Sequence, residues 1–200
     1  MTISLAIDTS TSRTSVAIVE GNALLWHGFR DGATSHGSAL PALVSEGLAV
    51  QQRIDQVVVG MGPGPYTGLR VGIAFAHTFA LARRIPVVGV CSIDAIASLV
   101  HEDFEFIVAT DARRKEIYWA KYSMGTRVDG PHVDRPEVVA QLDLPIYGEG
   151  AVKYSIASAD DPLYPDSLSL VTLSQSTDSQ ISEPLYLRRP DAVPTKERLA

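Results

Sequence analysis

The chain has little cysteine and no long apolar run. Cys91 is the single cysteine among 200 residues, which excludes an internal disulfide framework and suits a reducing compartment. No apolar run approaches the roughly 20 residues that a membrane-spanning helix needs. We expect no leader peptide, because a strand at Ile3–Ile7 begins without a charged stretch before it. These absences predict a cytosolic protein with no membrane contact.

The chain also lacks an excess of positive charge. Its formal net charge is −6, and an acidic chain is a poor binder of nucleic acid on its own, because cationic contacts dominate that affinity. Three short basic clusters occur at Arg83-Arg84, Arg113-Arg-Lys115 and Arg188-Arg189. We interpret them as solvated faces rather than as an RNA footprint, so any contact with RNA is expected to be indirect.

The usual catalytic motifs are missing as well. The Gly62–Gly68 segment lacks the Gly-Lys-Ser/Thr ending of a phosphate-binding loop, and no serine stands in a Gly-x-Ser-x-Gly turn. Cys91 ends an apolar strand and is interpreted as core. No pair among the histidines is spaced for one helical face, so we expect no metal site and no catalytic residue; they are His27, His36, His77, His101 and His132.

What is present is a core-rich chain, 46% hydrophobic, large enough for one domain or two small lobes. The first half alternates strands and helices, which is typical of an α/β lobe with parallel central strands. Thr67 and Ser92 are predicted N-caps. The predicted strands are 3–7, 16–19, 23–29, 57–61 and 85–90, and the predicted helices are 37–50, 68–84 and 93–101.

The second half begins like the first. Leu5–Asp8 is an apolar strand ending in aspartate, followed by a polar turn and another strand, and Phe106–Asp111 repeats this order. The pattern predicts duplicated lobes with a cleft between them, although similar hairpins can arise by chance. We expect lobes at 1–100 and 101–200, the second including a loose tail. Its predicted elements are a strand at 117–122, a helix opening at Arg135-Pro136, a strand at 145–147 and a loop over 157–180.

The helix predicted at 68–84 is apolar on nearly every side. Gly68, Gly72, Ala76 and Ala80 leave one face almost without side chains, while Phe75 and its neighbours make a large apolar face. A helix of this kind must be buried on nearly every side. One face can lie on a sheet, and the other then needs a partner.

Asp8 and Asp111 are the candidate paired carboxylates, each at the end of a buried strand. They could hold magnesium or orient water against a phosphate. Alternatively, each simply accepts backbone N–H groups of its own turn. We favour the second interpretation, because the turn after Asp8 contains no glycine and a phosphate-binding loop generally needs one.

The run Gly62-Pro-Gly-Pro-Tyr-Thr-Gly-Leu-Arg70 closely resembles the Gly-Pro-Gly-Ser-Phe-Thr-Gly-Leu-Arg run of the TsaB family, also called YeaZ-like proteins. Five further segments resemble that family in order along the chain: Leu5–Ser10, Ser92–Ala97, Asp111–Tyr118, Tyr147–Ala151 and Pro184–Arg188. The resemblance implies an actin/Hsp70/sugar-kinase-like α/β fold with two ribonuclease-H-like lobes and a degenerate active site.

The resemblance also implies a function. TsaB-like proteins act in forming threonylcarbamoyladenosine beside the anticodon of tRNA, where a related subunit, TsaD, holds the metal and transfers the threonylcarbamoyl group. They lack the metal-binding histidines of TsaD, pair with it or with a second copy of themselves, and help to recruit an ATPase subunit, TsaE. This chain is accordingly expected to be a non-catalytic partner of a TsaD-type subunit and a homodimer when alone.

The resemblance carries two sets of residues onto this chain. The implied partner interface is Leu40, Leu43, Val44, Gly68, Leu69, Gly72, Phe75, Ala76, Phe79 and Ala80. The implied vestigial nucleotide cleft is Asp8, Thr9, Ser10, Gly62, Gly64, Asp111, Gly148 and Gly150. No cofactor is expected, with weak ATP or ADP binding left open at a lobe or subunit interface.

Some residues depart from the family pattern. Pro65 and Tyr66 replace serine and phenylalanine, His36-Gly37-Ser38 replaces His-Ser-Glu, and the second lobe diverges most. The contacts with TsaE therefore cannot be carried over. Three alternatives stay open: a peptidase-like hydrolase, an ATP-using transferase of the same fold, and a homodimeric scaffold with other clients.

Overall fold

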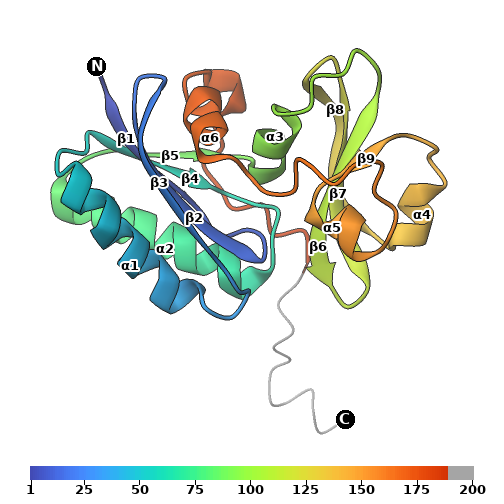
Figure 1. The fold of residues 1–200 in the computed structure, drawn as a ribbon, viewed down its shortest axis with the longest axis horizontal. Helices are drawn as coiled ribbons and strands as arrows, with labels where there is room; N and C mark the ends of the chain where they lie inside the picture. Colours follow the sequence, from blue (N-terminus) through green and yellow to red (C-terminus); the bar gives the residue numbers. More distant parts are fainter. Residues whose placement is uncertain (189–200) are drawn as a thin grey trace, which may run out of the picture.

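The computed structural model describes residues 1–188 as two lobes, each built on one β-sheet (Figure 1). The first sheet has the strand order β3-β2-β1-β4-β5 and the second the order β8-β7-β6-β9. The first contains β1 (Ile3–Asp8), β2 (Arg13–Glu20), β3 (Ala23–Asp31), β4 (Gln56–Gly60) and β5 (Val87–Val90). The second contains β6 (Phe106–Arg113), β7 (Glu116–Ser123), β8 (Thr126–Asp134) and β9 (Ile146–Tyr147).

The two sheets repeat one arrangement. β1 lies antiparallel to β2 and parallel to β4, and β6 lies antiparallel to β7 and parallel to β9. In each lobe a third antiparallel strand follows a turn that contains a glycine with positive φ, Gly21 or Gly125. The duplication expected from the two strand-then-aspartate segments is therefore present in the topology.

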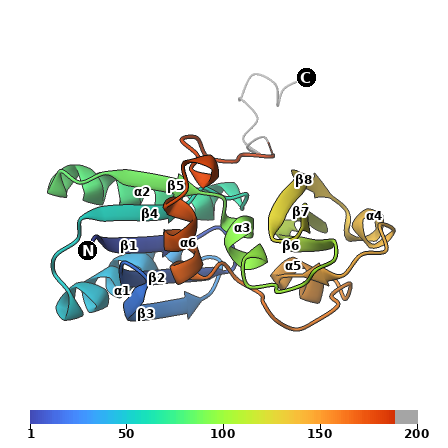
Figure 2. The ribbon, with the colours of Figure 1, turned by 90° about the horizontal axis from the view of Figure 1, so that it is seen from above.

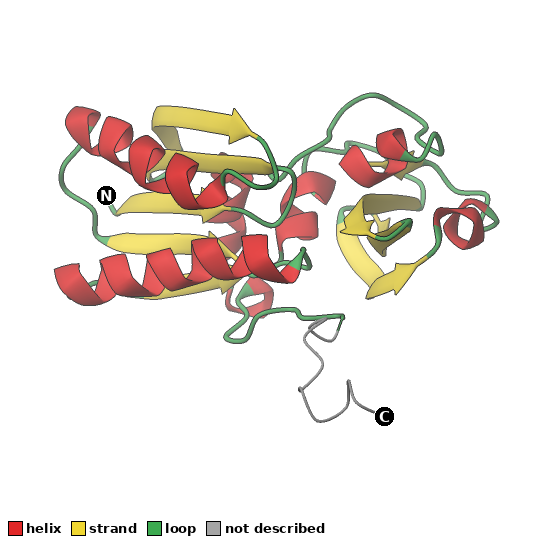
Figure 3. Ribbon diagram, turned by 90° about the horizontal axis from the view of Figure 1, so that it is seen from below, coloured by secondary structure: helices red, strands yellow, loops and turns green. Residues whose placement is uncertain are grey.

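Four helices cover the first sheet. α1 (His36–Val50) and α2 (Tyr66–Arg83) lie side by side across one face (Figure 3). α6 (Ser167–Ser174) lies on the other face, with α3 (Ser92–Ala97) beside it at the junction with the second lobe (Figure 2). Both faces of β1 and β4 are thus buried, which is why these strands are almost continuously apolar.

Two clusters of side chains fill these interfaces. Leu5, Ile7 and Leu43 belong to the cluster beneath α1 and α2, and they are fully buried. Ala6 and Val58 face the opposite way, into the cluster beneath α6. This alternation follows from the two-residue period of a strand.

In the second lobe, α5 (Glu149–Lys153) packs on β6, and α4 (Pro136–Ala140) lies at the far end with proline in its first turn, as predicted. After α5 the chain returns to the first lobe, where α6 packs on β1, β2, β4 and β5. The expected division at residue 100 therefore does not separate the lobes. The second sheet and its helices are in effect an insertion into the first lobe.

Several local predictions need correction. α2 begins at Tyr66 with Pro65 as its N-cap, so Thr67 lies in the first turn and is not the cap. α3 ends at Ala97 and its N-cap is Cys91, because the Ser92 hydroxyl instead donates to the Asp8 carboxylate over 2.7 Å. A long-range hydrogen bond therefore takes the place of the predicted cap.

The predicted loop at 157–180 contains two helices, α6 and the 3₁₀ helix η1 (Thr177–Ser179). α6 is capped by Asp166, whose side chain accepts a hydrogen bond from the Ser169 amide over 2.8 Å. A serine-rich segment forms a helix here because Leu170 and Val171 are buried on the first sheet. The predicted tail over the last dozen residues lies outside the described part of the chain. Within residues 1–188, no helix combines the length and the apolarity needed to cross a membrane.

Candidate functional site

The Asp8 turn, at the carboxyl end of β1, is closed by hydrogen bonds from its own lobe. The Asp8 carboxylate accepts from the Ser10 amide over 2.8 Å, from the Ser10 hydroxyl over 2.7 Å and from Ser92. Burial raises the pKa of Asp8, and these hydrogen bonds act against that rise. A Cβ on Gly60 would collide with the Asp8 carboxylate. The end of β4 can therefore lie this close to Asp8 only because residue 60 is a glycine.

The glycine-rich segment packs on the same turn. Thr9 Oγ1 donates to the Gly68 carbonyl over 2.8 Å and accepts from the Gly72 amide over 3.1 Å. A Cβ on Gly64 would stand 2.8 Å from the Ser10 Cα. The glycines of this segment therefore allow it to pack closely on the backbone and side chains of the Asp8 turn.

Asp111, the second candidate carboxylate, is also satisfied within its lobe. It accepts from the Arg113 amide over 3.1 Å, from Lys153 Nζ over 2.6 Å and from the Tyr154 hydroxyl over 3.1 Å. Beside it Gly148, at φ +101°, and Gly150 allow α5 to pack closely on the backbone of β6. Both aspartates thus accept hydrogen bonds from backbone amides of their own turns, which agrees with the interpretation that we favoured from the sequence.

All eight residues of the expected nucleotide cleft are buried. Asp111 borders only a small cavity of about 240 Å³, and of the eight only Gly64 lines the larger cavity described below. The eight residues are therefore covered by other described parts of the chain.

Several polar contacts join the lobes, and two of them, at Glu149 and Asp94, were not expected from the sequence. The Ser12 amide donates to Glu149 Oε1 over 3.2 Å, and the Ser12 hydroxyl bonds the other carboxylate oxygen. Burial raises the pKa of Glu149. On the α3 side, the Tyr122 hydroxyl donates to Asp94 over 2.6 Å. Spacing along the sequence gives no signal for contacts across 137 and 28 residues.

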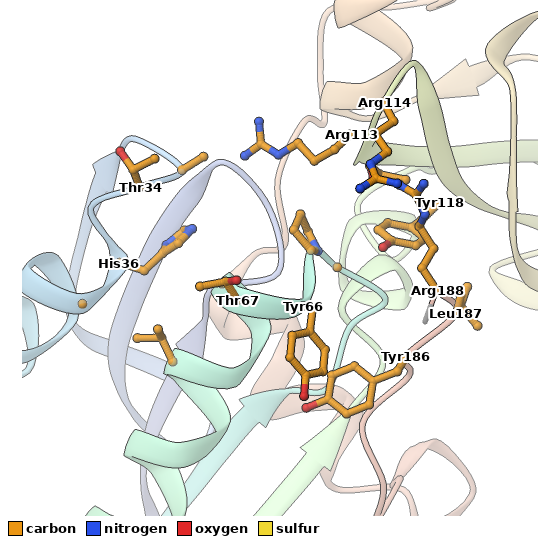
Figure 4. Close-up of a pocket in the computed structure, with 17 residues that line it drawn as sticks. Thr34, His36, Tyr66, Thr67, Arg113, Arg114, Tyr118, Tyr186, Leu187 and Arg188 are labelled. Atoms are coloured by element: carbon orange, nitrogen blue, oxygen red, sulfur yellow. The ribbon is translucent and has the colours of Figure 1, made fainter. Parts of the chain in front are cut away.

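A cavity of about 760 Å³ lies between the lobes. Figure 4 shows Arg113 reaching across it toward His36, with Arg114 and Arg188 on the same wall and Tyr66 beside Tyr186. Arg113 and Arg114 are exposed, in agreement with their interpretation as solvated, and they also line this cavity. It is lined by residues 33–34, 36–37, 64–68, 71, 112–114, 118 and 186–188.

The expected partner interface is mostly inside the protein. Phe75 and Phe79 are half-buried, and their rings stack 6.0 Å apart. The other members lie on the inner faces of α1 and α2 and are buried within the chain, so they expose little surface to a partner; they are Leu40, Leu43, Val44, Gly68, Leu69, Gly72, Ala76 and Ala80. The small face of α2 lies on Thr9 and the first sheet, and its outer face bears Arg70, Ala74 and Thr78.

Titratable groups do not assemble into a metal centre in the part of the chain that the structure describes. His36 is buried, with Nδ1 2.8 Å from the Thr14 hydroxyl. Cys91 is core, as interpreted from its strand, and burial raises the pKa of its thiol.

Comparisons with known proteins identify the family of this chain. The sequence model of the TsaD family, described as tRNA N6-adenosine threonylcarbamoyltransferase, matches residues 33–181. An uncharacterized protein of Mycobacterium tuberculosis (strain H37Rv) is 40% identical over 203 residues, which are 95% of this chain and 93% of that protein. A relative from Mycobacterium leprae is also 40% identical, and the match spans 57% of its length.

The tRNA threonylcarbamoyladenosine biosynthesis protein TsaB of Escherichia coli is 32% identical over 125 residues, 59% of this chain and 54% of that protein. A solved structure of YeaZ from Pseudomonas aeruginosa matches with a TM-score of 0.75 at 25% identity, covering 94% of this chain and all of the other. The repeated sheets define an actin/Hsp70/sugar-kinase-like fold with two ribonuclease-H-like lobes. The chain belongs to the TsaD family and, within it, to the TsaB (YeaZ-like) proteins.

Proposed function

We propose that this chain is a cytosolic, non-catalytic subunit in the formation of threonylcarbamoyladenosine in tRNA. Its family includes a tRNA threonylcarbamoyltransferase, and its E. coli relative is named for this biosynthesis. One structural observation carries the non-catalytic part of the proposal. The two carboxylate turns, where this fold would bring reactive groups together, are hydrogen-bonded internally and buried.

Under this proposal the chain works by binding a TsaD-type catalytic subunit, and a TsaE-type ATPase joins that pair. The chain pairs with a second copy when alone and affects tRNA only indirectly. The surface we propose for the TsaD-type subunit is the outer face of the α1–α2 pair. Along α1 its exposed residues are small or apolar with one charge, Glu46; they are Gly37, Ser38, Pro41, Ala42, Ser45, Glu46, Ala49 and Val50.

This face suits helix-to-helix packing. Ala74 and Thr78 are exposed on α2, with half-buried Val71 and Phe75 beside them. Small exposed residues let another helix approach closely, while the half-buried rings offer apolar area at the edge of the contact.

The test is light scattering on the purified chain, alone and mixed with the TsaD-type protein of its own organism. We expect a one-to-one complex that displaces any homodimer. Ala74→Arg and Ala42→Arg place a large charge on exposed positions of the proposed face and should weaken the complex at least tenfold. Gln141→Arg adds the same charge to an exposed site of the second lobe and should leave the complex intact.

Two outcomes would refute parts of this proposal. A chain that does not bind the TsaD-type protein would contradict the accessory role and return the function to the enzyme and scaffold alternatives. Normal binding by both α1 and α2 variants, with unchanged melting temperatures, would keep the role and overturn the surface.

A further inference from the structure

Three of the four sheet edges in the described part of the chain are protected from further pairing. At β5 the Ile181 amide donates to the Gly89 carbonyl over 2.9 Å, so a later segment covers this edge. β9 has only two residues, and the Ser158 amide donates to the Ile146 carbonyl over 2.9 Å. β8 contains Pro131, which has no backbone N–H, and its pairing with β7 has two irregularities. Covering segments, short strands, proline and bulges are the usual means of keeping other chains off a sheet edge.

β3, the fourth edge, lacks most of these protections. It is nine residues long, contains neither proline nor lysine, and lies at the margin of the first sheet with no described element beyond it (Figure 2). One bulge, at Leu25, interrupts its pairing with β2, and residues 26–31 pair regularly. Leu24 and Phe29 are 51% and 42% exposed. β3 therefore presents an unpaired backbone edge beside exposed apolar side chains, which is a template for another strand.

The charges of β3 do not oppose such pairing. Arg30 and Asp31 carry its only formal charges, at the end of the strand. Arg30 is held within the chain by Glu46 at 2.9 Å and by the Phe29 carbonyl at 2.9 Å, an acceptor with a second lone pair. Asp31 pairs with Arg13 at 2.7 Å, and the Arg13 guanidinium lies over the Phe29 ring at 3.9 Å. Both charges are therefore neutralised locally, and the ring of Phe29 is held in place on the strand.

We propose that two copies of this chain pair through β3, antiparallel and centred on His27. In this register Leu25 of each copy lies opposite Phe29 of the other, which brings two exposed apolar side chains together. Trp26 lies opposite Gly28, so the larger residue faces one without a side chain. A strand edge that complements itself in this way forms a closed dimer with two-fold symmetry.

This register brings no like formal charges together. Arg30 and Asp31 lie opposite Leu24 and Ala23 of the other copy. His27 lies at the two-fold axis, so each copy of this residue faces the other. A charge introduced at residue 27 would therefore face an identical charge, and like charges directly opposite each other destabilise a strand pair.

This pairing supplies the contact for the homodimer of the proposed function, and in that respect it rests on that proposal. β3 adjoins the face proposed for the TsaD-type subunit, because Glu46 belongs to that face and pairs with Arg30. A TsaD-type subunit bound over α1 would therefore compete with the second copy for this part of the molecule.

Sedimentation equilibrium of the full chain alone, over a series of concentrations, tests the proposal. We expect a dimer whose dissociation constant rises at least about fivefold in His27→Lys and in His27→Asp. An equal mixture of these two variants should dimerise again, because lysine then faces aspartate. His101→Lys is the matched control: it makes the same change at an exposed histidine outside β3, and the dissociation constant should stay within about twofold. Thermal melts of all variants establish that each is folded.

A wild-type chain that stays monomeric at every concentration, or a mixture of the two variants that fails to pair, would overturn the inference. A dimer that His27→Lys leaves unchanged and Ala42→Arg dissociates would also overturn it, by placing the contact on α1. Binding of the TsaD-type protein by His27→Lys should match the wild type, and its loss would assign the edge to that subunit instead. Absent binding by the wild type itself would refute only the accessory role, so the two failures are distinguishable.

Discussion

The amide of Gly72 donates a hydrogen bond to Oγ1 of Thr9 over 3.1 Å, and that hydroxyl lies only 2.4 Å from where a Cβ on Gly72 would be. Gly72→Ala should therefore destabilise the protein, because the buried hydroxyl must move away from two hydrogen bonds. We expect a loss of about 2 kcal/mol, since the better helix propensity of alanine returns only part of the cost.

Gly37→Ala is the matched control for this change. Gly37 lies exposed in α1, and no atom lies within 4 Å of an added Cβ. This variant should be more stable than the wild type by about 0.5–1 kcal/mol. Urea unfolding of both variants makes the measurement, and a neutral Gly72→Ala would contradict the packing described for α2.

Glu149, which bonds Ser12 across the lobes, makes the stability of the protein depend on pH. Burial raises its pKa above the ordinary 4.5, so the folded state holds the proton more tightly than the unfolded state. The stability contributed by the protonated form is thus lost as pH rises from about 4.5 through the folded pKa. Glu149→Gln cannot ionise and should gain stability relative to the wild type across that window.

Unfolding at a series of pH values from acid to neutral tests this. Glu46→Gln, at an exposed carboxylate paired with Arg30, should show no comparable gain. If the stability difference between Glu149→Gln and the wild type does not change with pH, the raised pKa is wrong.

His36 reports on the charge of the cavity. Its pKa is lowered first by burial and second by the positive charge of Arg113. Arg113→Gln should therefore raise the pKa of His36, and Arg53→Gln should leave it unchanged. A proton NMR titration of the histidine ring measures this. An unchanged pKa in Arg113→Gln would show that the guanidinium group does not act across the cavity.

The contribution of α6 to the stability of the first lobe can be tested at Leu170. This residue of α6 is fully buried against the first sheet. Leu170→Ala should cost about 2–5 kcal/mol, because it leaves a cavity in that interface. Leu81→Ala, at a leucine that is 80% exposed on α2, should change the free energy of unfolding by less than about 0.5 kcal/mol. Equal effects would mean that α6 contributes little to the first lobe.

The fold was largely predictable because its signals are local. The two apolar strands that carry Asp8 and Asp111 and the helix start at Pro136 were predicted correctly from neighbouring residues. The errors come from long-range contacts. Ser92 bonds Asp8 across 84 residues, which displaces the predicted cap, and α6 is stabilised by a sheet that lies far away in the sequence.

The site was predicted less well for a related reason. Small residues every four positions in α2 indicate a close approach, but they do not say to what. The structure gives the answer: Thr9 and the first sheet. The arginines of the cavity come from two distant segments, at 113–114 and 188, and no pattern along the chain brings them together.

The insertion of the second lobe has a consequence for how the chain folds. The sheet face over Ala6 and Val58 is covered only after α6, which follows the entire second sheet in the sequence. When a helix near the end of the chain packs on strands near its beginning, the mean sequence separation of contacting residues rises, and such topologies fold slowly. During synthesis, the part of this sheet face that α6 covers therefore stays exposed until the second lobe has been made.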